Sequence, residues 1–75
     1  MVTSQLIQIG SRVLVQDQDG TAEFTVVGRE ESDVAAGRIS CESPLGRALL
    51  GHGPGDRVDV RAPAGVRSVT IVDVD

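Results

Sequence analysis

The chain has 75 residues, which is enough for one small domain but not for two, because so short a chain buries only about 60% of its unfolded surface. Its eleven acidic and seven basic residues give a net charge of −4, which opposes direct contact with the phosphate backbone of nucleic acid. The single cysteine excludes an intrachain disulfide and a cysteine metal cage, and no apolar run approaches the ~18 residues of a membrane span, so we expect a cytoplasmic domain without metal or cofactor.

The first half of the chain predicts a β-hairpin. Residues 11–16 read as a strand, because valines recur at the period of two that a pleated strand requires. The pair Asp19-Gly20 then predicts a tight turn, since glycine accepts the positive φ that hairpin turns demand. A second strand follows over residues 22–28, with Ala22 and Phe24 on one face.

A polar loop and a short third strand follow the hairpin. Residues 29–37 contain four acidic or hydroxyl side chains in a row, which predicts a solvated loop with a turn of helix, closed by Gly37. Residues 38–41 predict a short strand, with Ile39 and Cys41 directed to the same side.

The sequence Ser43-Pro44 predicts the start of a helix. Serine is a favoured N-cap residue, and proline at the first helical position loses only an N–H that has no partner there. An apolar stripe follows at helical spacing, made of Leu45, Ala48 and Leu49. Gly51 stands where a left-handed C-terminal cap is expected, so the helix has about two turns.

The last third of the chain predicts two more strands. Residues 56–61 alternate valines with charged residues, which indicates one buried and one solvated face. A turn over residues 63–65 leads into a long final strand over residues 66–74. The order of elements predicts an α+β domain, in which an antiparallel curled sheet of about five strands packs on one short helix.

No pattern in the sequence indicates catalysis or metal binding. His52 lies in a glycine-rich loop without the partners of a catalytic triad, and we expect it to be exposed. Cys41 is expected to point into the core from the third strand. Around Asp19-Gly20 the glycine comes too early for a calcium loop, so we interpret this segment as a turn. We therefore expect no catalytic residue.

The start of the predicted helix is the candidate binding site. A helix N-terminus offers free N–H groups and partial positive charge, Pro44 offers a rigid apolar contact, and the Glu42 carboxylate can meet an arginine of a partner. On spacing alone, a plain helix cap with a solvated Glu42 is the stronger interpretation.

Two motifs resemble the C-terminal domain of the bacterial Gre transcription elongation factors. Residues 39–51 read ISCESPLGRALLG, and residues 55–65 read GDxVxVxxPxG, which are similar to the strand–helix step and the hairpin of that family. The resemblance covers residues 9–75, and we interpret residues 1–8 as an N-terminal segment, a remnant of a linker. Given this resemblance, a binding site at Glu42-Ser43-Pro44 becomes the stronger interpretation than a plain helix cap.

The resemblance implies an FKBP-like fold and a role in transcription. It implies that the domain docks on a coiled coil of the largest RNA polymerase subunit beside the secondary channel, without touching nucleic acid. The implied contact motif is Glu42-Ser43-Pro44, and we extend the expected surface to Arg47 on the helix and Asp33 in the acidic loop. Gly46 stands where a better helix former is common, which would cost about 0.5–1 kcal/mol.

Three functional interpretations follow from the resemblance. The first is a polymerase-binding module that, without the helical arm expected to serve transcript cleavage, does not stimulate cleavage by itself. The second is a Gre-like regulator that binds polymerase and natively lacks cleavage. The third, suggested by the FKBP-like fold, is a peptidyl-prolyl isomerase; it is disfavoured because such sites use aromatic side chains and Phe24 is the only one here.

Overall fold

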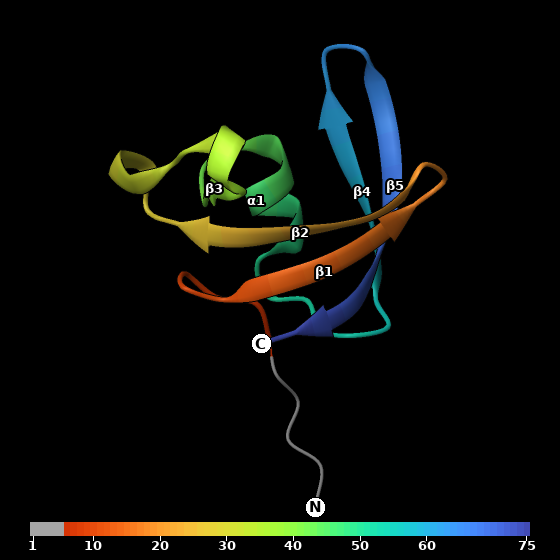
Figure 1. The fold of residues 1–75 in the computed structure, drawn as a ribbon. Helices are drawn as coiled ribbons and strands as arrows, with labels where there is room; N and C mark the ends of the chain where they lie inside the picture. Colours follow the sequence, from red (N-terminus) through yellow and green to blue (C-terminus); the bar gives the residue numbers. More distant parts are fainter. Residues whose placement is uncertain (1–5) are drawn as a thin grey trace, which may run out of the picture.

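The computed structural model describes residues 6–75, which form one curled sheet around one helix (Figure 1). The elements in chain order are β1 (Arg12–Asp17), β2 (Gly20–Val27), the 3₁₀ turns η1 (Arg29–Glu31) and η2 (Val34–Ala36), β3 (Arg38–Ser40), α1 (Pro44–Leu49), β4 (Arg57–Ala62) and β5 (Gly65–Val74). Within residues 6–75, no helix is long and apolar enough to span a bilayer.

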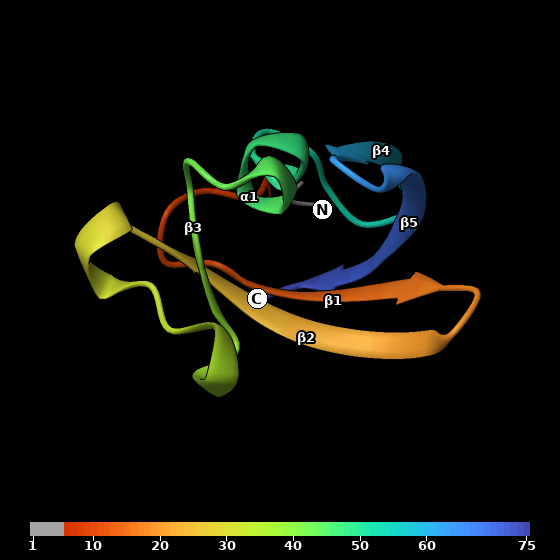
Figure 2. The ribbon, with the colours of Figure 1, turned by 90° about the horizontal axis from the view of Figure 1, so that it is seen from above.

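The five strands lie in the order β3-β2-β1-β5-β4 and curl so that α1 occupies their concave side (Figure 2). The predicted α+β architecture of a curled sheet on one short helix is therefore confirmed. Both predicted hairpins are present, and in each a glycine with positive φ directly follows a two-residue turn. These glycines are Gly20, with φ of 126°, and Gly65, with φ of 131°. Glycine is favoured there because a Cβ would strain the backbone.

One strand pair differs from the predicted antiparallel sheet. β3 runs parallel to β2, with Thr25 opposite Arg38 and Val27 opposite Ser40. The reason is the connection over residues 28–37, which leaves the end of β2 and returns to its middle before β3 begins. Gly37 makes this return with a φ of 79°. Because the loop doubles back in this way, the chain reverses its direction twice, and β3 runs in the same direction as β2.

A β-bulge in β5 accounts for part of the curl. Leu14 of β1 pairs with Asp73, whereas its neighbour Val15 pairs with Ile71, so Val72 is an extra residue in β5. The inward-facing residues of β5 are Val69, Ile71 and Val74. Their spacing is therefore two residues before the bulge and three residues across it. Bulges of this kind bend a strand and increase its twist. β5 can therefore pair with β1 along one half and with β4 along the other.

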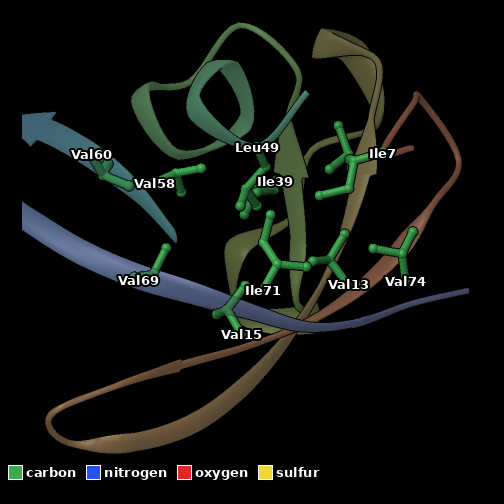
Figure 3. Packing of buried hydrophobic residues seen from close by; sticks show 11 residues of the cluster. Ile7, Val13, Val15, Ile39, Leu49, Val58, Val60, Val69, Ile71 and Val74 are labelled. Atoms are coloured by element: carbon green, nitrogen blue, oxygen red, sulfur yellow. The ribbon is translucent and has the colours of Figure 1, made fainter. Parts of the chain in front are cut away.

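The core lies between the concave face of the sheet and α1 (Figure 3). Its buried apolar residues are Ile7, Val13, Val15, Val26, Ile39, Leu49, Val58, Val60, Val69, Ile71 and Val74. Cys41 packs against this cluster but is only partly buried. Nearly all core residues are β-branched, which suits a pleated surface.

The core begins earlier in the chain than residue 9. Ile7 is only 2% exposed, its N–H donates to the His52 carbonyl at 2.8 Å, and its own carbonyl accepts from Gly51 at 3.0 Å. These bonds join the N-terminal segment to the loop that follows α1. Residues 6–8 thus belong to the folded unit, while the rest of the predicted segment 1–8 lies outside the described residues.

Candidate functional site

Ser43 caps α1 as the sequence predicts. The Gly46 N–H donates to Ser43 Oγ at 3.0 Å, and Pro44 occupies the first turn. The Ser43 hydroxyl in turn donates to the Ser40 carbonyl at 2.7 Å, so both its donor and an acceptor position are used. A cap held on two sides fixes the position of the exposed Pro44 ring.

Ser40 holds the segment in front of the helix. Its carbonyl also accepts from the Ser43 N–H at 3.0 Å, and its Oγ accepts from the Glu42 N–H at 3.0 Å. Ser40 is the last residue of β3, which pairs with β2. The Glu42-Ser43-Pro44 step is therefore attached to the sheet by three hydrogen bonds rather than hanging from a free loop.

Gly46 is required by this packing, which corrects its interpretation as merely a weak helix former. A Cβ on Gly46 would lie 2.1 Å from the Ser40 carbonyl oxygen and 3.0 Å from Cys41 Cα. A Cβ does not occur 2.1 Å from a carbonyl oxygen, so any larger side chain would displace α1 from β3. Glycine thus allows the helix start to approach the end of the strand that holds its cap.

Glu42 is exposed beside Arg29, an arginine that no motif in the sequence marks. Its carboxylate lies 3.9 Å from the Arg29 guanidinium, and the two side chains are 55% and 74% exposed. The parallel pairing of β2 and β3 explains this pair, because Arg29 and Glu42 each lie two residues beyond paired strand ends. An exposed pair of this kind is weak, so Glu42 remains available to a cation of a partner.

Arg47 lies on the same surface as the helix start. A shallow hollow of about 420 Å³ separates the start of α1 from β4. Four of its six lining residues are charged, and the full set is Glu42, Pro44, Arg47, Ala48, Asp59 and Arg61. The structure therefore groups four of the predicted site residues, Glu42 to Pro44 and Arg47, around the first turn of α1.

Asp33 lies away from this group. It forms an isolated bridge with Arg38, with backbone hydrogen bonds of 2.9 Å in both directions. Asp33 bridges Arg38, the first residue of β3, whereas Glu42 lies two residues after the end of that strand. β3 therefore lies between Asp33 and Glu42. A partner that contacts both would have to extend along β3.

A second, apolar hollow of about 490 Å³ lies on the other side of Pro44. Its lining residues are Val15, Asp17, Gly20, Ala22, Phe24, Ile39, Ser43, Pro44, Leu45, Val60, Arg67 and Val69. They come from all five strands and the start of α1. Pro44 therefore lines both hollows, whereas Ser43 lines the apolar one.

His52 and Asp56 form a local clasp in the loop after α1. Asp56 Oδ2 accepts from the Gly53 N–H at 2.9 Å and lies 3.4 Å from His52 Nδ1. The Gly53 hydrogen bond, and to a smaller degree His52, hold the pKa of Asp56 below its ordinary value of 3.8. Among residues 6–75, no cluster of three His, Cys, Asp or Glu side chains could hold a metal ion.

This clasp gives a testable pH dependence. The pKa of Asp56 is lower in the folded chain than in the unfolded chain, so the ionised carboxylate stabilises the fold. This stabilisation is fully present above pH 3.8, and it is lost as the pH falls through the pKa of Asp56 in the folded chain. We expect the amide shift of Gly53 to titrate with a midpoint below 3.8, measured by NMR. The titration should disappear in Asp56→Asn, and a midpoint at or above 3.8 would contradict the assignment.

Sequence comparison relates the whole described domain to one family. The sequence pattern of "Transcription elongation factor, GreA/GreB, C-term" matches residues 2–75. The transcription elongation factor GreA of Brucella canis is 44% identical over 73 residues, which are 95% of this chain and 46% of that protein. GreA of Brucella abortus gives the same values. The chain thus spans less than half the length of these relatives.

Structural comparison agrees with the sequence. The GreA factor homolog 1 of Thermus thermophilus superposes with a TM-score of 0.83 at 32% identity, over 97% of this chain and 50% of that one. The Gfh1 protein of Thermus aquaticus gives 0.84 at 33%, over 96% and 49%. A GreA/GreB factor from Nitrosomonas europaea gives 0.77 at 29%, over 97% and 62%.

Proposed function

Since the chain belongs to the GreA/GreB family of transcription elongation factors, through its C-terminal domain, we propose that it is a module that binds bacterial RNA polymerase. The proposed contact is a coiled coil of the largest subunit beside the secondary channel, in the cytoplasm. The binding surface is the first turn of α1, with Glu42, Ser43 and Pro44 at its centre and Arg47 at its side.

The rigidity of the helix start supports this proposal most directly. Ser40 accepts three hydrogen bonds from Glu42 and Ser43, and the Gly46 N–H donates to the Ser43 cap, while Pro44 and the Glu42 side chain remain exposed. A surface that is fixed before binding loses little conformational entropy when a partner docks. The exposed carboxylate suits a basic partner, as does the net charge of −4.

The test is to remove the proposed contact. In the double variant Ser43→Ala/Pro44→Ala, binding to RNA polymerase and to its isolated coiled coil should be abolished, as measured by titration calorimetry. The loss of the cap should cost only about 1 kcal/mol of stability, so the domain should remain folded. Retained full affinity would reject this surface as the binding site.

A proline in another loop provides the control. Pro54 is exposed, as Pro44 is, but it lies beyond the other end of α1. Pro54→Ala should bind with unchanged affinity. If wild-type chain forms no saturable complex with the polymerase, the proposed function itself is wrong.

We propose that the chain acts by binding and is not an enzyme. Phe24 is the only aromatic side chain that could line a prolyl isomerase pocket, and α1, with six residues, provides no long helical arm of the kind expected for transcript cleavage. An isomerisation assay on a proline peptide should show no acceleration. In a transcript cleavage assay, addition of this polypeptide to a stalled elongation complex should leave the cleavage rate unchanged.

A further inference from the structure

β4 lies at one end of the sheet and offers a regular edge (Figure 1). The strand order ends in β5-β4, so β4 pairs with β5 only. Its pairing runs without a shift of register from Arg57 opposite Thr70 to Ala62 opposite Gly65. β3, at the other end of the sheet, has only three residues. β4 is therefore the longer of the two end strands and the better template for an added strand.

Alternate residues of β4 direct their backbone groups outward. Ile71 of β5 bonds on the side of β4, because its N–H donates to the Asp56 carbonyl at 2.8 Å and its carbonyl accepts from the Gly55 N–H at 2.7 Å. The bonding side alternates along an antiparallel pair, so Val58 and Val60 bond to β5 and their neighbours do not. The residues whose N–H and C=O groups face the free edge are Arg57, Asp59 and Arg61. Among residues 6–75, no backbone group outside β5 bonds to them.

The shallow hollow of about 420 Å³ lies along this edge. Asp59 and Arg61 are exposed and point away from the core, whereas Pro44 and Ala48 belong to the helix on the concave side. A hollow that all four residues line must run beside the strand, between its free edge and α1. An added strand needs about 4.8 Å of space beside its neighbour, and the hollow leaves this side of β4 uncovered.

The charges along the edge determine which strand fits it. The exposed side chains alternate as Arg57, Asp59 and Arg61. Within the part of the chain that the structure describes, none of the three forms an ion pair. Asp59 Oδ1 accepts from Ser68 Oγ at 2.7 Å, which holds the carboxylate on the outer face of the sheet. An added strand is stabilised where it places a basic residue opposite Asp59 and an acidic residue opposite an arginine.

β4 itself meets this requirement when two copies run antiparallel. With Val60 opposite Val60 of the second copy, each Asp59 lies opposite the other copy's Arg61, and each such pair exchanges two backbone hydrogen bonds. A register with Asp59 opposite Asp59 sets like charges against each other. A register centred on Val58 also pairs arginine with aspartate, but it places the turn of the second copy against the loop over residues 53–56.

We infer that the chain forms a symmetric dimer, in which β4 of one copy pairs with β4 of a second copy about Val60 and the sheet continues across both molecules. A few backbone hydrogen bonds and exposed ion pairs make a weak contact, so the dissociation constant should lie at about 0.1–1 mM. The second copy would cover the hollow that Pro44 and Arg47 also line, so the dimer hides part of the proposed polymerase surface. That consequence rests on the proposed function, whereas the dimer does not.

Exchanging charges across the edge tests the dimer. In sedimentation equilibrium up to about 2 mM, the average mass of the wild-type chain should rise from one chain toward two. Asp59→Arg sets arginine against arginine and should weaken association by at least about tenfold. The double variant Asp59→Arg/Arg61→Asp restores opposite charges in this register but not in the one centred on Val58, so it should regain the association of wild type.

A charge change elsewhere provides the control. Glu30→Arg makes the same change of charge at an exposed residue of η1, which adjoins β3 at the other end of the sheet. It should associate as wild type does. Thermal unfolding of all the variants establishes that they are folded.

Amide shifts of the unaltered chain locate the contact. As the concentration rises, the largest changes should occur at Asp59 and Arg61, whose N–H groups gain acceptors. A chain that stays monomeric at about 2 mM, an Asp59→Arg variant that associates as wild type does, or a double variant that does not recover overturns the inference. If these amides shift only on addition of the polymerase coiled coil, the edge binds the polymerase instead, and the dimer is wrong while the proposed function stands. A dimer that forms in a chain unable to bind polymerase would reject only the proposed function.

Discussion

Replacing Gly46 with alanine is expected to destabilise the domain by about 2 to 3 kcal/mol, even though alanine is the better helix former. The new Cβ would lie 2.1 Å from the Ser40 carbonyl oxygen, which is a backbone atom and cannot rotate away. Relief requires α1 to move away from β3, which stretches the bonds between Ser40 and Ser43. The free energy of unfolding from urea titration gives the measurement, with the midpoint lowered at similar slope.

Gly28→Ala is the matched control for this substitution. Gly28 has a φ of −66°, and a Cβ there meets only the Glu31 side chain, at an ordinary 3.8 Å. The change should be neutral or stabilising by about 0.4–1 kcal/mol, because alanine restricts the unfolded chain. If Gly46→Ala proves as stable as wild type, the close approach of α1 to β3 is wrong.

The same substitution should also weaken polymerase binding. A displaced α1 carries Pro44 and the Ser43 cap with it, so the contact surface loses its fixed geometry. We expect the affinity to fall even at temperatures where Gly46→Ala is fully folded. Binding that is unaffected in the folded variant would indicate that the exact position of the helix start matters little.

Leu49→Ala is expected to cost about 2–5 kcal/mol, which is a large fraction of the roughly 5–15 kcal/mol that stabilises a native domain. Leu49 has no exposed surface and extends from α1 into the centre of the core (Figure 3). Because α1 has only six residues, it is held by packing rather than by its own hydrogen bonds. Circular dichroism on heating should show a large fall in melting temperature.

The control for Leu49 is another leucine at the surface. Leu6 is 56% exposed, so Leu6→Ala should change the unfolding free energy by less than about 0.5 kcal/mol. A small effect of Leu49→Ala, comparable with that of Leu6→Ala, would mean that α1 does not contribute to the core as described.

The features that sequence predicted are those encoded by neighbouring residues. The alternation of β4, the turn at Asp19-Gly20 and the Ser43 cap each depend on a few consecutive side chains, and all are present in the structure. The parallel direction of β3 was not predictable in this way. It depends on how residues 28–37 fold back on β2, and their composition indicates only a polar loop.

The candidate site was predictable to a similar extent. Glu42, Ser43 and Pro44 are consecutive, so a motif could identify them. The role of Gly46 depends on the carbonyl of Ser40, which approaches only after α1 packs on β3, and the partner of Glu42 comes from η1. The apolar hollow draws residues from all five strands, and no local pattern unites them.

The extra residue in β5 makes part of the curvature a matter of chain length rather than of side-chain chemistry. A chain shortened by Val72 alone would still place Val69, Ile71 and Val74 inward and Asp73 outward, in strict alternation. Its hydrophobic pattern would be at least as regular as the present one. Yet the strand would lose the bend at the bulge, and the half of β5 that pairs with β4 would carry β4 away from α1.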